Sequence, residues 1–228
     1  MRHWRTESIK ATALELGFDS RGAEDCALQY LIARTSFATE IPNLPAHGHP
    51  LIRLIARVFE TILYSADPHY HTTEYQQSLD ELRSDLENIP LISQDEKISK
   101  EDTATLELTR LATLVYLERV SRNFSGQSAQ IALWTKAAQP LLARLDTLPC
   151  PFSLFVFGCE AHTDEDRIIL LNFFTKIERT RHFNVLFEVK GLIQTAWIQH
   201  DLAVDRELEY IHKLNLVLSS RNVVPSFF

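Results

Sequence analysis

The sequence predicts an all-α fold, a single irregular bundle of about eight to nine helices. Leucine outnumbers valine by 32 residues to 10, and leucine loses little rotamer freedom in a helix, whereas β-branching favours strands. The 228 residues include only 6 glycines and 9 prolines, which disfavours folds that need many tight turns or glycine-rich phosphate loops. Apolar residues recur three and four positions apart along most of the chain, as in amphipathic helices. Neither a linker nor an internal repeat divides residues 1–228, so one domain is expected.

Proline and glycine separate the helices that are expected in the first half. Proline removes a backbone donor and restricts the residue before it, so segments 43–50 and 67–71 are predicted to be loops. Thr73, with Gln76 three residues later, has the spacing of a capping box and predicts a helix start at Thr73. The expected helices span 6–16, 21–37, 51–65, 73–88 and 103–123.

The second half contains one segment that could be either a helix or a strand. Segment 152–159 is apolar throughout and could be a buried strand, but no second strand is evident to pair with it, so a buried helix is expected. Thr163 and Asp166 form an N-cap signature, and Asn184 is expected to cap the helix after that. The expected helices span 128–146, 152–159, 163–181, 184–201 and 205–219.

Charge and cysteine content restrict the partners. The chain has 30 acidic and 23 basic residues, a net charge of −7, so it repels a phosphate backbone and autonomous nucleic-acid binding is not expected. Without an apolar run of 18 residues, membrane insertion is not expected. The basic start Met1–Arg5 is followed by polar residues rather than by a signal-peptide core. Three cysteines without CxxC spacing, Cys26, Cys150 and Cys159, fit reduced thiols in the cytoplasm or nucleus.

The order of features from residue 114 onward carries a family resemblance. The sequence LVYLERV at 114–120 precedes a proline-bounded apolar run that ends in Gly-Cys-Glu-Ala at 158–161. An acidic turn leading to Arg167 follows, and then Asn184 and Trp197. This order closely resembles the C-terminal half of the fungal-specific transcription factor domain, the all-helical regulatory region behind the binuclear zinc cluster of many fungal regulators.

The resemblance, clear over about residues 104–202 and weaker over 20–90, implies a regulatory scaffold that contacts partners, responds to an effector and controls an attached DNA-binding domain. The family's six-cysteine cluster has no counterpart here, and three scattered cysteines cannot hold two zinc ions. We therefore expect a finger-less relative that binds an apolar small molecule or a protein partner in the regulation of secondary metabolism. A homodimer is one form that this partnership could take.

The most specific part of the resemblance supplies a structural motif. Glu160 and Arg167 are seven residues apart, and we expect them to form a buried bidentate ion pair that fixes the start of the following helix. Cys159 is expected to be a small buried core residue, since an activated thiolate needs exposure and a nearby cation. The residues assigned to this motif are Gly158, Cys159, Glu160, Arg167 and Asn184.

Histidine is frequent, with nine copies, but the pattern does not predict a metal site. The His-x-His pairs at 47–49 and 69–71 and His162 beside acidic residues lack further ligands at a readable spacing, so neither a metal nor a cofactor is expected. His200 and Asp201 are adjacent and would point about 100° apart on a helix, so they are not expected to act as a catalytic dyad.

Aromatic residues are concentrated in the second half, and most of them are expected in the core. In the helix expected at 128–146, Trp134 and its neighbour Leu133 are both expected to face inward. Aromatic walls with a few polar groups are also what an apolar ligand pocket requires. The candidate lining residues are Tyr116, Arg119, Trp134, His182 and Trp197.

One enzymatic alternative follows from such a pocket. A cofactor-independent cyclase or isomerase of a polyene or terpenoid could work by holding the reacting ends together and donating one hydrogen bond, because proximity alone can supply about 7–11 kcal/mol. No motif marks a catalytic residue. A closed aromatic cavity would favour the enzyme or a ligand sensor, whereas an exposed apolar stripe at helical spacing would favour a protein-interaction module.

Overall fold

Eight helices and no strand make up the part of the chain that the computed structural model describes, which is residues 50–63, 67–91, 99–180, 184–202 and 209–219. The expected all-α class is confirmed. The helices expected at 6–16 and 21–37 lie outside the described residues. The helices are α4 (Pro50–Thr61), α5 (Thr73–Asn88), α6 (Lys100–Arg122), α7 (Ala129–Arg144), α8 (Pro151–Glu160), α9 (Asp164–Thr180), α10 (Asn184–Leu202) and α11 (Tyr210–Ser219).

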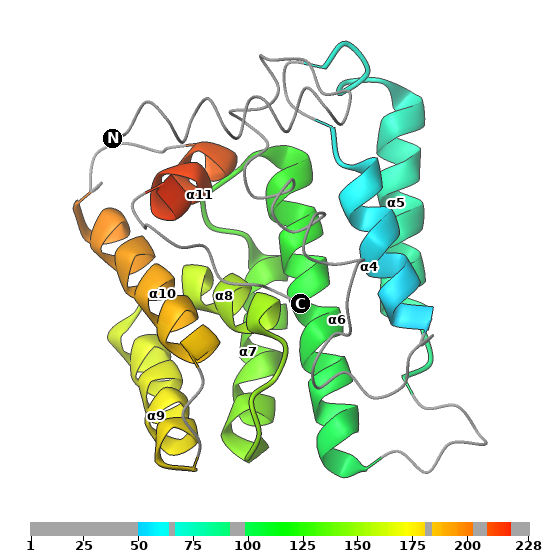
Figure 1. The fold of residues 1–228 in the computed structure, drawn as a ribbon. Coiled ribbons are helices and arrows are strands. Elements are labelled where there is room, and N and C mark those ends of the chain that lie inside the picture. Colours follow the sequence, from blue (N-terminus) through cyan, green and yellow to red (C-terminus); the bar gives the residue numbers. More distant parts are fainter. Residues whose placement is uncertain (1–49, 64–66, 92–98, 181–183, 203–208, 220–228) are drawn as a thin grey trace.

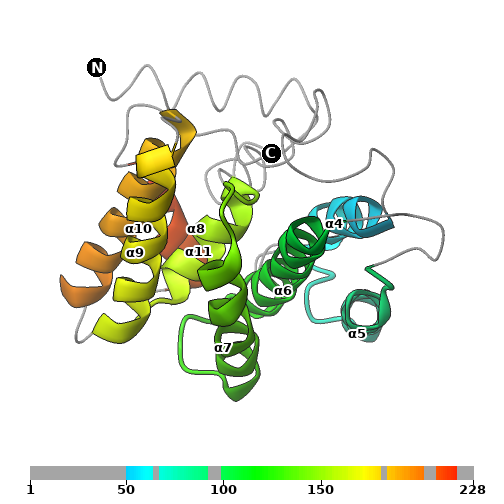
Figure 2. The same cartoon turned by 90° about the horizontal axis from the view of Figure 1, so that it is seen from below.

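Helix α6 is the axis of the fold. It contacts α4, α5, α7, α8 and α11, and every residue of 111–121 is buried, so this part of the helix has no solvent-facing side. Figures 1 and 2 show α4 and α5 on one flank of α6, and α7 and α8 on the other, with α9 and α10 beyond them. Most residues of 111–117 are accordingly apolar, and the buried hydroxyl of Thr113 donates to the carbonyl of Thr109 within the helix.

Capping side chains set several helix starts, and one start and one capping residue differ from expectation. Helix α6 begins at Lys100 rather than near Thr103, because the hydroxyl of Ser99 accepts a hydrogen bond from the amide of Asp102 at 3.0 Å. Helix α5 begins at Thr73 as expected, but its cap is Thr72, whose hydroxyl accepts a hydrogen bond from the amide of Tyr75 at 3.3 Å. Helix α4 is shorter than the expected 51–65 and ends at Thr61.

Helix α7 corrects one core assignment. Its cap is Ser128, as its predicted start at this residue requires, and Trp134 is buried. Leu133 is 64% exposed, so the expectation that it faces inward is wrong. The buried residues Ile131, Trp134 and Ala138 are three and four positions apart, and a neighbour of Trp134 points about 100° away from that face.

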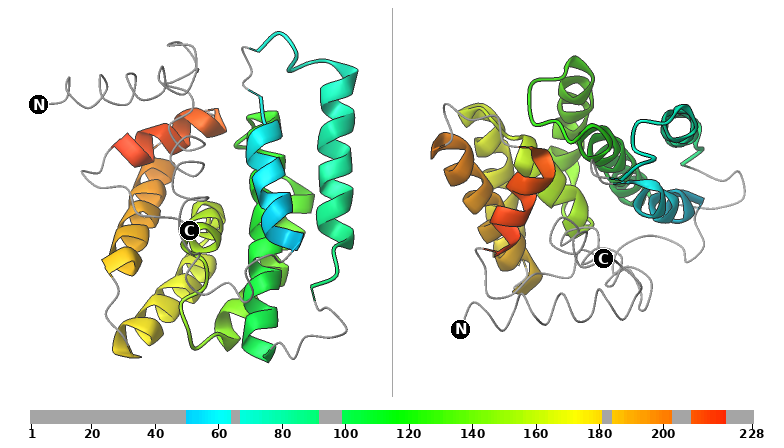
Figure 3. Two further views of the ribbon diagram at one scale, coloured as in Figure 1. Left: turned by 45° about the vertical axis from the view of Figure 1, so that its right-hand side comes forward. Right: turned by 90° about the horizontal axis from the view of Figure 1, so that it is seen from above.

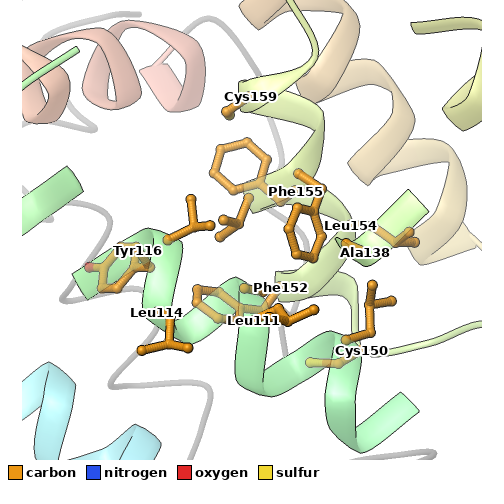
Figure 4. Close-up of a cluster of buried hydrophobic side chains, with 14 of the residues drawn as sticks. Leu111, Leu114, Tyr116, Ala138, Cys150, Phe152, Leu154, Phe155 and Cys159 are labelled. Carbon is orange, nitrogen blue, oxygen red and sulfur yellow. The ribbon is translucent and has the colours of Figure 1, made fainter. Parts of the chain in front are cut away.

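Helix α8 is buried at all ten of its positions, which confirms the expectation of a buried helix between residues 152 and 159. Pro151 occupies its first turn, where the missing amide hydrogen does no harm. Side chains of α8 meet those of α6 in one cluster that includes Phe152, Phe155 and Leu111 (Figure 4). Cys159 lies in this core as expected, and burial raises the pKa of the Cys150 and Cys159 thiols to about 12, so both stay protonated.

Close contact between α8 and α10 depends on Gly158. A Cβ atom at this position would lie 2.3 Å from Cγ1 of Ile193, a fully buried residue of α10. The carbonyl of Gly158 also accepts a hydrogen bond from the indole Nε1–H of Trp197 at 2.8 Å. The glycine therefore lets the two helices approach, and Trp197 joins them at the same residue.

We expect Gly158→Ala to destabilise the fold. Overpacking a dense core costs about 1–3 kcal/mol, and the better helix propensity of alanine offsets only about 1 kcal/mol of this. Urea unfolding followed by circular dichroism measures the change. The same substitution should cost less in an Ile193→Ala background, where the atoms that clash are absent. A variant as stable as the wild type would contradict this account of the contact.

The starts of the last three helices are defined in different ways. The hydroxyl of Thr163 accepts from the amide of Asp166 at 3.2 Å, which confirms the predicted N-cap of α9. Asn184 is the first residue of α10, and the residues before it lie outside the described ranges. Helix α11 begins at Tyr210, later than the expected 205, and its first turn is held by Asn123, whose Oδ1 accepts from the amide of Ile211 at 3.0 Å.

Candidate functional site

A buried ion pair joins α6 to the end of α8. Arg119 and Glu160 are 3% and 6% exposed. The guanidinium donates through Nε to Oε1 at 2.9 Å and through Nη2 to Oε2 at 2.7 Å, so the pair is bidentate. Burial favours the neutral acid, but His162 and the Arg119 guanidinium outweigh burial and lower the pKa of Glu160. Both groups are therefore ionised in the core.

The remaining donor atom of Arg119 holds the loop that follows α6. Its Nη1 donates to the carbonyls of Phe124 at 3.0 Å and Gly126 at 2.5 Å. The guanidinium carbon also lies 5.8 Å from the centre of the Tyr210 ring at the start of α11. One side chain of α6 thus contacts α8, α11 and the α6–α7 loop.

This geometry overturns the expected Glu160–Arg167 pair. Arg167 instead donates to both carboxylate oxygens of Asp201 in α10, at 2.9 and 2.6 Å. Helix α8 ends at Glu160, and α9 starts in a new direction at Asp164, so a seven-residue spacing does not correspond to two turns of one helix. Arg167 does fix this connection in another way, because its Nε donates to the carbonyl of Ala161 at 3.3 Å.

His162 lies beside the ion pair, and His200 lies against His162. The ring of His162 is 4.5 Å from the ring of His200, and its Nε2 is 3.7 Å from Oε2 of Glu160. Burial lowers the pKa of His200, and the nearby His162 and Lys213 lower it further, while Asp201 opposes the change. His200 and Asp201 have different partners, since one stacks on His162 and the other binds Arg167.

His200 gives the fold a pH dependence. Folding lowers the pKa of His200 from its value of about 6.5 in the unfolded chain. Below that pH the unfolded chain binds a proton more readily than the folded chain, and this proton binding favours unfolding. This contribution to stability is complete above that pH and is lost as the pH falls towards the folded pKa. We expect His200→Gln to reduce the difference between unfolding free energies measured at pH 7.5 and pH 5.5. An unchanged difference would contradict this role of His200.

The described candidate pocket residues lie on α6, α7 and α10. Arg119 and Trp197 both bind the last turn of α8, at Glu160 and at Gly158. Tyr116 contacts the first turn of α8, with its ring 5.5 Å from that of Phe152. Trp134 is buried on α7. His182 lies outside the described residues.

A hollow of about 430 Å³ opens elsewhere, between the end of α5 and the first half of α6. Arg110 closes one side of it, binding both oxygens of Glu107 at 2.7 Å and the carbonyl of Leu86 at 3.1 Å. None of the candidate pocket residues lines this hollow. Its lining residues are Glu87, Ile89, Pro90, Leu91, Thr103, Glu107 and Arg110.

The described ranges were compared with the patterns of metal sites and of membrane-spanning helices. Within them, no three His, Cys, Asp or Glu side chains are grouped so that they could hold a metal ion. His47 and His49, the first of the His-x-His pairs, lie outside these ranges. No described helix is both long enough and apolar enough to cross a bilayer.

Comparison with known proteins decides the family. The model of the fungal specific transcription factor domain matches residues 37–212, a segment that includes α4 to α10 and the first residues of α11. The chain belongs to this family. The transcription factor iacI of Pestalotiopsis fici is 35% identical over 125 residues, which are 54% of this chain and 32% of that protein. The match therefore spans about a third of the relative. No solved structure matches the chain.

In this fungal transcription factor domain, sequence reasoning found the ion-pair residues but not their pairing. The sequence predicts Arg119 as a pocket-lining residue, although it lies in the LVYLERV stretch that carries the resemblance. Asn123 was missed as the anchor of α11, and its left-handed backbone (φ 45°) is a signal that appears only in coordinates. Asp201 was considered only with its neighbour His200, because nothing in the sequence points to Arg167, 34 residues earlier.

Proposed function

We propose that this chain is a regulatory module of a fungal transcription factor and that it acts through contact between one face of α10 and a protein. The observation that carries the proposal is the exposure of three large apolar residues on this helix. Phe187, Ile198 and Leu202 are 68%, 58% and 81% exposed. They are eleven and four positions apart, a spacing that places all three on one side of a helix. Exposed apolar residues that line up in this way are typical of interaction surfaces.

Packing of the candidate pocket residues supports a protein partner over an apolar small molecule. Tyr116, Trp134 and Trp197 are at most 9% exposed, and the indole of Trp197 is bound to the carbonyl of Gly158. The donors of Arg119 are directed at Glu160 and at two loop carbonyls. These groups already have partners in the fold, so we favour the surface of α10. No observation on the described residues favours the cyclase, and we do not propose it.

The proposal includes a nuclear location and control of secondary-metabolite genes. Membership of the family and the name of the similar Pestalotiopsis fici protein, a transcription factor, support the nuclear location. Control of secondary-metabolite genes stays a prediction.

A tethered reporter assay tests the proposal. The full chain, fused to an unrelated DNA-binding domain in a fungal host, is expected to change the expression of a reporter gene. Ile198→Asp should abolish the change, because a charge on the α10 face opposes burial against a partner. Leu133→Asp on α7 is the matched control, since Leu133 has a similar exposure of 64% and should tolerate the charge. A fusion that leaves the reporter unchanged, or equal activity of both variants and the wild type, would overturn the proposal.

A further inference from the structure

We infer that the outer face of α5, together with the hollow at the end of this helix, is a docking site for a lysine- or arginine-rich segment of another protein. Among the described helices, α5 packs mainly on α4 and α6, and its remaining side faces solvent. It lies on the opposite side of α6 from α10 (Figures 1 and 3). The site is therefore separate from the α10 face and does not depend on the proposed function.

The outer face of α5 carries negative charge along its length. Its exposed side chains include the carboxylates of Glu74, Asp80, Glu81, Asp85 and Glu87. The basic residue of the helix, Arg83, is bound to Glu118 of α6. Within the described ranges, only Asp85 of the five carboxylates forms an ion pair, with Arg57 of α4 at 2.9 Å. The face therefore attracts a positively charged partner and repels a phosphate backbone.

The carboxylates of α5 form two rows. Glu74 and Glu81 are seven residues apart, as are Asp80 and Glu87, and seven residues are almost two full turns of an α-helix. The row between them is uncharged and contains Gln77 and Ser84. From Glu74 to Glu87 the helix rises about 20 Å, a length that an extended chain of about six residues covers. A single small cation cannot meet both ends of these rows, so the partner is a chain segment.

The hollow gives this acidic face an apolar anchor point. Glu87 belongs to one acidic row and also lines the hollow, where residues 89–91 supply an apolar wall. The arginine of the lining, Arg110, already binds both carboxylate oxygens of Glu107, so it does not reverse the charge of the site. An apolar side chain of the partner fits the hollow while the neighbouring lysines or arginines face the carboxylates of α5.

Fluorescence anisotropy of the full chain with a labelled peptide, Lys-Lys-Leu-Lys-Lys-Leu-Lys-Lys, tests the inference. We expect binding that weakens between about 50 and about 200 mM salt, because salt screens exposed charges. Asp80→Asn combined with Glu87→Gln should lower the affinity by about tenfold. The matched control, Asp164→Asn combined with Glu165→Gln, removes the same two charges from the exposed start of α9 and should bind like the wild type. Circular dichroism spectra equal to that of the wild type show that both variants are folded.

A variant of the lining tests the hollow. Thr103→Phe places a ring in the hollow and should lower the affinity for the leucine-containing peptide severalfold, but not the affinity for a peptide of lysines alone. Equal effects on the two peptides would overturn the role of the hollow.

Three results would overturn the inference as a whole. The first is that the full chain does not bind the leucine-containing peptide. The second is that the α9 control lowers the affinity as much as the α5 variant, since binding would then follow net charge alone. The third is displacement of the peptide by spermidine at a similar concentration, because the site would then take a small cation instead of a chain segment.

Discussion

Arg119→Met is expected to lower the free energy of unfolding by about 3–5 kcal/mol, because it leaves the Glu160 carboxylate buried without its counter-ion. Methionine keeps much of the side-chain volume, so the effect comes from the lost charge and hydrogen bonds rather than from a large cavity. The α6–α7 loop also loses the bonds that hold the carbonyls of Phe124 and Gly126. Urea unfolding followed by circular dichroism measures the change.

A double variant separates the ion pair from general damage to the core. The double variant Arg119→Met/Glu160→Leu removes both charges. Its free energy of unfolding should fall by less than the sum of the losses measured for the two single variants. Arg57→Met is the matched control, because Arg57 and Asp85 form an ion pair whose side chains are about half exposed. Such surface pairs contribute about 0–1 kcal/mol. If Arg57→Met and Arg119→Met lowered the free energy of unfolding equally, the buried pair would contribute no more to stability than the exposed pair.

Trp197→Ala is expected to cost about 3–5 kcal/mol, as for other buried tryptophans that are truncated to alanine. The indole is 9% exposed and donates to the carbonyl of Gly158, so the variant loses both packing between α8 and α10 and a buried hydrogen bond. The midpoint of thermal or urea unfolding should fall accordingly.

Two companion variants define the role of this indole. Trp197→Phe keeps an aromatic ring but no N–H. Its free energy of unfolding should therefore fall by less, about 1 kcal/mol for the lost hydrogen bond together with a small loss of packing. Leu133→Ala, at an exposed apolar position, should stay within about 0.5 kcal/mol of the wild type. If Trp197→Ala unfolded like the wild type but lost a bound apolar molecule, the indole would belong to a pocket wall instead of the core.

Local features of the fold could be predicted from the sequence, whereas contacts between distant segments could not. The periodic spacing of apolar residues was enough for α5, α6 and α9 to be expected within a few residues of their observed bounds. Ser99 could have been recognised as the cap of α6, since Asp102 follows it three residues later. Leu133 could also have been placed on the surface, because it does not share the three- and four-residue spacing of Ile131, Trp134 and Ala138.

The candidate site shows the limit more clearly. Glu160 and Arg167 are near each other in the sequence, and this proximity suggested a pair. The actual partner, Arg119, is 41 residues away on another helix. Which of two arginines meets a buried carboxylate depends on how α6 packs against α8, and the spacing of residues along one segment carries no information on that packing.

The complete burial of α8 has a consequence for synthesis of the chain. Helix α10, which covers one side of α8, begins at Asn184, more than twenty residues after α8 ends. While a ribosome is still adding those residues, the sequence from Phe152 to Phe157 has no cover on that side and is a target for chaperones or for aggregation. Chains that stop before Asn184 should therefore accumulate in the insoluble fraction of a cell lysate, whereas the full chain should not.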